Sequence, residues 1–195
     1  MKNKLHIYRC FKTNYKCLTS FILLFPFFML SQYETQRFEL ISSFDNIEIR
    51  YYPSSMMIKY DGGKDSSSGF GSLFRYISGS NDLNQKISMT TPVHMRKTEN
   101  KTTMEFVLPA EIKAKTAPIP SNSSLELYES KAQHYAAIKY GGYTNLEKEI
   151  RLSEELISKL KLNNIVVNGE SRVLVYNSPY RFINRSNEII IPIIY

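Results

Sequence analysis

The order of the predicted elements is the feature that most constrains the fold of this chain. Strand, strand, helix, strand, strand are predicted in that order over about residues 38–108, and the same order recurs over 123–195. The two halves share this order without a residue-level repeat. Eight strands and two helices arranged in this way predict an α+β fold, namely a distorted antiparallel β-barrel of two pseudo-symmetric ββαββ halves with a helix from each half packed outside.

The first half consists mostly of strand-forming segments. Phe38–Tyr60 is predicted to form two strands, and within it Ile47–Tyr52 alternates in the two-residue period of a half-buried strand before Pro53 ends it. Lys86–Val93 and Thr103–Leu108 are predicted to be the two strands that follow the helix.

The helix of the first half carries an apolar stripe. Phe70, Leu73, Phe74 and Ile77 occur at i, i+3, i+4 and i+7, so they share one face of a helix that Gly79 can end. Such a stripe can pack in a core or form one wall of an apolar groove. We expect Leu73 and Ile77 to be core residues, and Phe70 and Phe74 to lie at the edge of a groove.

The second half contains a longer helix. Leu125–Ser130 and His134–Tyr140 are predicted strands, and the helix is predicted over Asn145–Leu162. Thr144 and Glu147 have the spacing of a capping box, in which each side chain accepts from the other's backbone N–H. The expected apolar face consists of Leu146, Ile150, Ile157 and Leu160.

A hairpin and a last strand are predicted after this helix. Asn168-Gly169 is a two-residue hairpin signal between Ile165–Val167 and Ser171–Tyr176. Glu188–Ile194 is the last strand, and Pro192 predicts that it lies at a sheet edge or contains a bulge.

Residues 1–31 differ in composition from the rest of the chain. They contain five Lys or Arg residues and no acid, so the remaining residues carry only +2 of the net charge of +7. A nearly balanced domain gives no electrostatic reason to expect nucleic-acid binding. Both cysteines, Cys10 and Cys17, lie in this segment, so the predicted domain has no thiol nucleophile or cysteine-held metal.

The same segment has the pattern of a targeting signal. Its basic part precedes the apolar run Leu18–Leu30, which is shorter than the roughly 20 residues of a membrane-spanning helix and contains Pro26. We therefore predict a secretory signal peptide or signal anchor, with a poor cleavage site after Ser31. The expected location is the secretory pathway, the extracellular space or a membrane held through this uncleaved segment. Targeting to an organelle is the alternative.

Five short motifs occur in the order and spacing of one known family. They are Ile47–Tyr52, Phe70–Asn81, Gln85–Val93, Met104–Pro109, and Tyr176–Pro179 with Asn187-Glu188. Together they closely resemble the SOUL/heme-binding protein family over about residues 38–195. The resemblance implies a distorted barrel of two pseudo-symmetric halves, in agreement with the element order.

The resemblance also implies a function. Family members bind haem and other porphyrins non-covalently in an apolar groove beside the first helix, and some are proposed to carry tetrapyrroles between compartments. We therefore expect haem or a related porphyrin as the ligand and no enzymatic activity, since the chain contains no GxSxG, HExxH or P-loop motif. An effector-binding module for another small hydrophobic ligand is an alternative, because the architecture resembles ligand-binding domains of some bacterial multidrug regulators. An enzyme of tetrapyrrole metabolism is a lesser one.

A haem site needs an apolar slot for the macrocycle and cations for two propionates. Phe70 and Phe74 are the candidates for the slot, and Met57 and Met89 are adaptable apolar residues on strands expected to neighbour it.

The family resemblance suggests two cations for the propionates. Arg75 leaves the first helix beside the apolar stripe, and Arg181 occupies another basic position of the family's proposed site. A third basic position of the family falls on Ser67, which would weaken propionate binding.

The axial position departs from the family pattern. Tyr51 stands where the SOUL branch has a histidine proposed to hold the iron. A phenolate binds ferric haem when a nearby cation lowers its pKa, but Tyr51 is better explained as a strand residue with an apolar ring. His94 and His134 match no family ligand and are expected to be hydrogen-bonded structural residues, so the sequence predicts no metal ligand beyond the weak candidate Tyr51.

Overall fold

The computed structural model describes residues 33–195, except 63–65, 99–100, 179 and 182. The predicted targeting segment of residues 1–31 lies outside the described residues. Tyr33–Tyr195 forms one compact unit. No helix among the described residues has both the length and the apolar composition needed to cross a bilayer.

One antiparallel sheet of ten strands forms the framework. Nine of the strands follow one another in the sheet as β2 (Glu39–Phe44), β3 (Ile47–Tyr52), β9 (Gln133–Gly141), β12 (Ser186–Ile194), β11 (Arg172–Val175), β6 (Val93–Lys97), β7 (Thr102–Val107), β4 (Met56–Gly62) and β8 (Leu125–Glu129). The tenth, β10 (Val166–Val167), also pairs with β12. The α+β class and the antiparallel pairing are confirmed. The barrel is not, because the described strands β2 and β8 do not pair and the sheet stays open.

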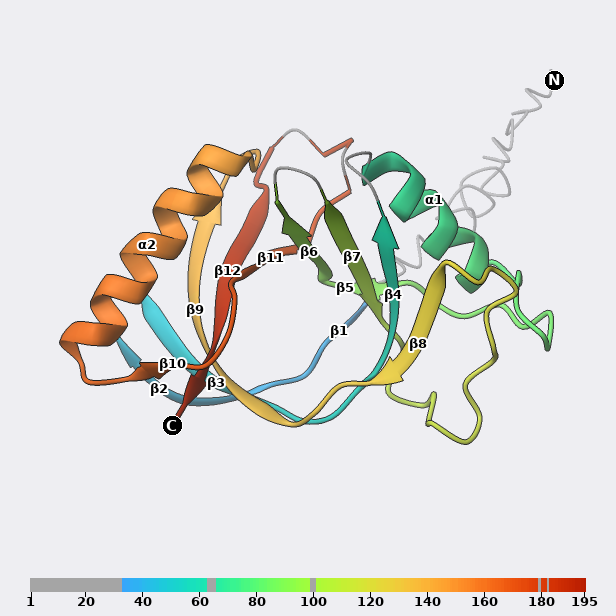
Figure 1. Cartoon of the computed structure of the whole chain (residues 1–195), viewed down its shortest axis with the longest axis horizontal. Coiled ribbons are helices and arrows are strands. Elements are labelled where there is room, and N and C mark those ends of the chain that lie inside the picture. The colour runs from blue at the N-terminus through green and yellow to red at the C-terminus, as the bar shows by residue number, and fades with distance from the viewer. Residues whose placement is uncertain (1–32, 63–65, 99–100, 179, 182) are drawn as a thin grey trace, which may run out of the picture. The chain divides into compact units, whose positions relative to one another are not determined.

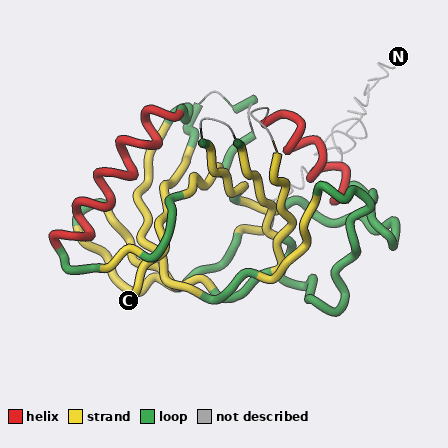
Figure 2. Tube along the Cα trace, viewed as in Figure 1, coloured by secondary structure: helices red, strands yellow, loops and turns green. Residues whose placement is uncertain are grey.

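Two helices cover the outer side of the curved sheet, α1 (Ser66–Ile77) and α2 (Leu146–Leu162). Figure 1 shows one on each flank, with the strands curving between them. The helix α1 packs against β4 and β7, and α2 packs against β9, β10 and β12. In Figure 2 both helices lie outside the curved run of strands, so the inner, concave face of the sheet is not covered by either helix. The predicted placement of the helices outside the sheet is therefore correct.

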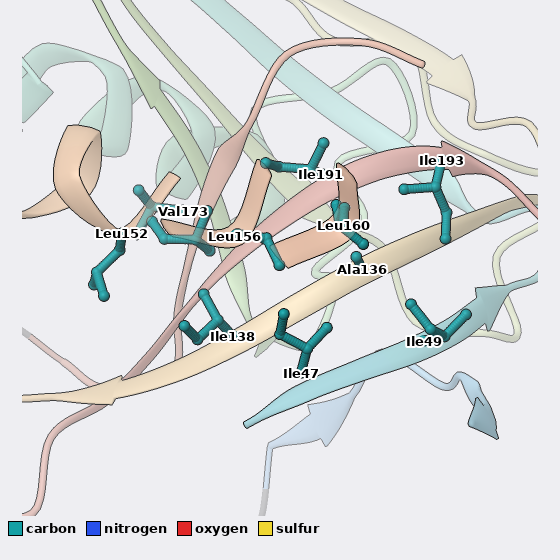
Figure 3. Close-up of a cluster of buried hydrophobic side chains, with 11 residues drawn as sticks. Ile47, Ile49, Ala136, Ile138, Leu152, Leu156, Leu160, Val173, Ile191 and Ile193 are labelled. Carbon is teal, nitrogen blue, oxygen red and sulfur yellow. The ribbon is translucent and has the colours of Figure 1, made fainter. Parts of the chain in front are cut away.

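Each helix closes its own apolar core. Under α1, buried Leu73, Tyr76 and Ile77 meet Ile58 and Phe106 of the sheet. Under α2, Leu152, Leu156 and Leu160 meet isoleucines of β3, β9 and β12, as Figure 3 shows. A single buried aliphatic side chain contributes roughly 1.5–3 kcal/mol through removal of its surface from water, so these two clusters hold the helices on the sheet.

The face of α2 that packs on the sheet differs from the predicted one. Its buried residues are Glu149, Leu152, Leu156 and Leu160, whereas Leu146, Ile150 and Ile157 are exposed. The two sets lie on adjacent flanks of the helix, so the apolar pattern covered a face that is wider than the surface in contact with the sheet. The capping box was also wrong, because Asn145 is the N-cap and accepts from the Lys148 backbone N–H.

Two strand predictions in the first half need correction. Phe38–Tyr60 contains three strands and not two, because Asp45 and Asn46 form a turn between β2 and β3. Lys86–Val93 is mostly extended chain without strand pairing. Within it, Thr90–Thr91 forms a short strand, β5, which pairs in parallel with β1 (Glu34–Thr35), and Val93 is the first residue of β6. Pro92, which follows a cis peptide bond, has no backbone N–H to donate and separates β5 from β6.

Two predictions in the second half were also wrong. β10 and β11 do not form a hairpin with each other, since both pair with β12. Pro192 lies in β12, which is central and not an edge strand. It is tolerated there because β11 pairs with β12 only as far as Ile190, and the pairing of β12 with β10 begins at Ile193. Pro192 therefore lies between the two partner strands.

Candidate functional site

The exposed aromatic pair of α1 is the first candidate surface. Phe70 is 38% exposed and Phe74 is 48% exposed, whereas Leu73 and Ile77 are buried, as expected. The two phenyl rings stack with centroids 6.0 Å apart and an interplanar angle of 13°. Phe70 also meets the buried ring of Phe106 edge to face, at 5.4 Å. Together they form an exposed aromatic pair that contacts the core through Phe106.

The exposed aromatic pair lies outside the five cavities that are described for residues 33–195. The cavities identified in the described part of the chain are lined by residues other than Phe70, Phe74 and Arg75. The apolar stripe is one face of a short helix, and the inner residues of this helix pack on β4 and β7. A ligand here would lie against the molecule with one face open to solvent.

A cation stands directly beside the aromatic pair. Arg75 is exposed, lies in the last turn of α1 and donates to Ser72 Oγ at 3.1 Å. No carboxylate pairs with it among the described residues. The helix ends as predicted, with Gly79 at φ +115° and its N–H donating to Tyr76 O.

The helix offers no evident ligand for iron. Tyr76 is its one residue with a side chain that could bind ferric haem, and it is fully buried with its hydroxyl donating to Pro118 O at 2.9 Å. Burial, aided by the charge of Asp82, raises the pKa of Tyr76 to about 12, so the phenol stays neutral at pH 7.

The two methionines lie on different faces of the sheet. Met89 lies outside the strands and packs at the margin of the core under α1. Met57 instead lines a cavity on the concave face, whereas its neighbours Met56 and Ile58 face α1. Alternation along β4 requires this, since adjacent side chains point to opposite faces. The expectation that Met57 neighbours the α1 surface was therefore wrong.

The second candidate cation, Arg181, lies in a loop and not on α1. Arg181 is exposed, and its Nε donates to Ile183 O at 3.1 Å. Its backbone carbonyl accepts from the Arg185 guanidinium at 2.9 Å. No hydrogen bond or ion pair connects it with Arg75 or α1 in the described residues. The side chain of Ser67, where the family has a basic residue, lies outside the described residues.

The axial candidate Tyr51 lies in the part of the sheet that α2 covers. It is on β3, with its ring 5.1 Å from that of His134, its cross-strand partner on β9. The His134 ring in turn lies 5.7 Å from that of Tyr195. Tyr51 continues the face of Ile47 and Ile49, which pack under α2, so it is not placed beside the α1 surface.

The concave face carries a polar network that the sequence analysis missed. Arg50, fully buried, donates to both carboxylate oxygens of Glu188 at 2.7 and 2.8 Å, and Tyr176 donates to the same carboxylate at 2.8 Å. Arg50 also binds Glu48 and Tyr52. Burial opposes its charge, but the hydrogen bonds of Glu188 outweigh this and the pKa of the guanidinium is raised. The two-residue alternation of Ile47–Tyr52 predicted that the face with Arg50 is exposed to solvent. The burial of Arg50 was missed because its partner Glu188 lies 138 residues further along the chain.

A second polar cluster lies along the same concave face. His94 Nε2 lies 2.8 Å from Gln36 Oε1, and Arg172 donates to Glu105 Oε2 at 3.2 Å. Tyr128 donates to the other oxygen of Glu105 at 3.0 Å. Burial, followed by repulsion from Arg172, lowers the pKa of His94 to about 3. His94 is therefore a neutral, buried histidine with a hydrogen-bond partner, as expected of a structural residue, although its local sequence did not identify Gln36 as that partner.

Comparison with protein families gives one match over most of the chain. The model of the family described as SOUL heme-binding protein matches residues 33–192. A search of curated proteins finds no significant match.

Solved structures show similarity of fold at low sequence identity. A hydrolase from Listeria innocua has a TM-score of 0.57 at 8% identity, covering 79% of this chain and 94% of that one. An uncharacterized conserved protein from Listeria innocua has a TM-score of 0.55 at 12% identity, covering 76% and 92%. The EcmrR C-terminal domain has a TM-score of 0.50 at 10% identity, covering 76% and 96%. Identities this low establish the shared fold and nothing about activity.

Proposed function

Because the chain belongs to the SOUL heme-binding protein family, we propose that it binds haem or a related porphyrin non-covalently against α1, and that it carries or buffers this tetrapyrrole. The observation that carries the proposal is the stacked, exposed pair Phe70 and Phe74. A flat macrocycle packed against the exposed part of these two parallel rings removes apolar area from water on both partners, and aromatic groups favour offset-stacked or edge-to-face contact.

Arg75 provides the charge that such a ligand needs. A guanidinium one residue from Phe74, with no carboxylate partner among the described residues, can bind a propionate bidentately, which fixes the orientation of the macrocycle. Arg181 does not enter this proposal, because its contacts lie within its own loop.

The proposed mode of binding does not require iron. Since α1 carries no ionisable iron ligand at neutral pH, the affinity comes from the macrocycle and the propionates. Haem and metal-free protoporphyrin should therefore bind with dissociation constants within a few-fold of each other. A haem affinity far above that of the metal-free porphyrin would contradict this mode of binding.

A porphyrin absorbance titration tests the proposal. The double variant Phe70→Ala/Phe74→Ala should raise the dissociation constant by about tenfold or more, and Arg75→Glu should also weaken binding. The matched control is Ile150→Ala/Ile157→Ala, which removes two exposed apolar side chains from α2. An unshifted Soret band at micromolar haem and protein would refute the proposal, as would equal weakening in the control.

A second candidate function is binding of another small hydrophobic ligand as an effector. The lack of an iron ligand on α1 favours it, because the same aromatic surface would accept any flat apolar anion. Native mass spectrometry of protein purified from its own host would separate the two functions by the mass of the bound molecule. An enzyme of tetrapyrrole metabolism remains the lesser alternative, and it requires a product to form from porphyrin over time.

The cellular location is a separate proposal, based on residues 1–31. Their basic and apolar pattern favours entry into the secretory pathway, with an organelle as the alternative. Cell fractionation with N-terminal sequencing of the mature protein tests this. A cytosolic protein that retains Met1 would refute both locations.

A further inference from the structure

A cavity of about 280 Å³ lies where the chain turns from β3 into β4. Its walls are residues 34–37 around the end of β1, the turn 53–56, the segment 107–113 after β7, and Glu129 at the end of β8. The volume corresponds to about nine water molecules at the density of the liquid. The cavity therefore has room for one small organic molecule of the size of an amino acid.

Hydrogen bonds hold the walls of this cavity against one another. Glu34 Oε1 accepts from the Ala110 backbone N–H at 3.1 Å, which joins the β1 wall to the segment after β7. Ser55 donates its backbone N–H to Ser130 Oγ at 3.0 Å, and Ser130 donates its own to Ser55 O at 2.8 Å, which joins the turn to the end of β8. The cavity is therefore preformed, as is usual for small-molecule sites.

The buried part of the lining is entirely apolar. It consists of Met56, Val107, Leu108, Pro109 and Ile112. Three of these residues, Met56, Leu108 and Ile112, belong to the core under α1. An apolar group that enters the cavity would be removed from water against these side chains, which is favourable by roughly 25 cal/mol per Å² of buried apolar surface.

Exposed charged residues of both signs complete the lining. They are two carboxylates and two cations, namely Glu34, Glu129, Arg37 and Lys113. None of the four forms an ion pair within the part of the chain that the structure describes. Glu34 is bonded to Ala110, which precedes Lys113 in the same short segment. A carboxylate and an ammonium group therefore belong to adjoining walls of the cavity.

This mixture of charges selects the class of ligand. A cation would meet Arg37 and Lys113, and an anion would meet Glu34 and Glu129, so a ligand with a single charge is repelled by half of the rim. A zwitterion is attracted by both halves, because its ammonium group donates to carboxylates and its carboxylate accepts from the cations. In an α-amino acid the two charged groups are neighbours and the side chain extends from the carbon between them. An aliphatic side chain can therefore reach the buried residues while both charges stay at the rim.

We propose that this cavity binds a free α-amino acid with an aliphatic side chain, whose ammonium group lies at Glu34 and whose carboxylate lies at Lys113. The site goes beyond the tetrapyrrole function and is separate from the porphyrin surface, because none of the described residues of α1 lines the cavity.

Calorimetric titration of the full chain with a series of related ligands tests the proposal. Leucine is compared with isoamylamine, which lacks the carboxylate, with isocaproate, which lacks the ammonium group, and with glycine, which lacks the side chain. Leucine should bind about tenfold tighter than each of the three, since each lacks one of the interactions. Equal binding of any of the three analogues, or no binding of leucine at millimolar concentration, overturns the proposal.

Two variants assign the charged groups. Glu34→Gln keeps an oxygen that can accept from Ala110 and should lose the preference for leucine over isocaproate. Lys113→Gln should lose the preference for leucine over isoamylamine. Glu111→Gln and Lys115→Gln are the matched controls, because these exposed residues of the same segment do not line the cavity, and they should keep both preferences. Leucine binding that is unchanged in both Glu34→Gln and Lys113→Gln overturns the assignment.

NMR of the methionine methyl groups locates the ligand in the wild-type protein, so the test does not depend on how the variants fold. Leucine should shift the methyl signal of Met56, which lines the cavity, and leave that of Met57, which lines a different cavity on the concave face. A shift of Met57 alone, or of neither signal when leucine is bound, overturns the location of the site.

Discussion

At the scale of single residues, the buried ion pair Arg50–Glu188 links β3 to β12 on the concave face. The pair is bidentate, and Tyr52 and Tyr176 satisfy further oxygen and nitrogen atoms. Both charges are almost completely removed from solvent. A buried pair of this kind is costly to break and contributes little net stability when intact.

Glu188→Ala should therefore lower the free energy of unfolding by about 3 kcal/mol, because it leaves the Arg50 guanidinium buried with Glu48 as its remaining acidic partner. Urea unfolding measures the change. The double variant Arg50→Met/Glu188→Leu, in which no buried charge is left, should recover most of the loss. A single variant as stable as the wild type would show that the network is not formed.

His94 predicts how stability depends on pH. Its pKa is about 3 in the folded protein against 6.5 as the ordinary value, so below pH 6.5 the unfolded chain binds a proton that the native protein does not. The free energy of unfolding therefore falls as the pH falls from 6.5 towards 3, by about 2 kcal/mol between pH 7 and pH 5.

Urea unfolding at pH 7 and pH 5 checks this dependence. His94→Gln cannot titrate in this range and should lose the His94 contribution, whereas His134→Gln should keep it. Parallel pH dependence in wild type and His94→Gln would contradict the assignment of the slope to His94.

At the scale of elements, adjacent positions of α1 serve different purposes. Leu73 is fully buried in the core under the helix, and Phe74 is almost half exposed. Leu73→Ala should lower the free energy of unfolding by about 3 kcal/mol through lost burial and the cavity it leaves. Phe74→Ala should lower it by less than about 1 kcal/mol while weakening porphyrin binding. Chemical denaturation of both variants, with a porphyrin titration, checks this division, and a large stability loss in Phe74→Ala would contradict it.

The start of α2 makes a separate prediction. Asn145 accepts from the Lys148 N–H at 2.9 Å and is the N-cap, although Thr144 and Glu147 have the capping-box spacing. Asn145→Ala should cost about 1 kcal/mol, and Asn145→Asp should cost nothing, because aspartate is an equally good cap. Thermal unfolding of the two variants measures this. A destabilising effect of Asn145→Asp equal to that of Asn145→Ala would show that the cap is not the cause.

At the scale of the whole molecule, the two faces of the curved sheet differ in chemistry. The convex face is apolar and closed by the helices, whereas the concave face carries buried charges, tyrosines and a neutral histidine. Tyr33–Tyr195 contains both faces and coincides closely with the part of the chain matched by the family. We therefore expect a variant that lacks residues 1–32 to keep the thermal midpoint and the porphyrin affinity of the full chain. Loss of cooperative unfolding in this variant would contradict the expectation.

The elements were largely predictable because their signals are local. The stripe from Phe70 to Ile77 and its glycine stop identify α1, and the pattern after Asn145 identifies α2. Errors occurred where a partner strand decides the outcome. Pro192 looked like an edge residue and lies in a central strand, because the strands on one side of β12 stop on either side of it. Which flank of α2 faces the sheet likewise depends on the isoleucines that it meets.

The same distinction between local signals and long-range contacts applies to the candidate sites. The sequence by itself determined the α+β class through the periodicity of its segments and their order, and five short motifs identified the family. The expected burial of Leu73 and Ile77 was also confirmed. Each of these signals lies within short stretches of the chain. Only the tertiary structure decided that Met57 faces away from α1, that Arg50 is buried against Glu188, and that His94 lies beside Arg172. These features join residues from distant parts of the chain, and pairing across a sheet, with the loss of solvent that follows, has no counterpart in the local pattern of the sequence.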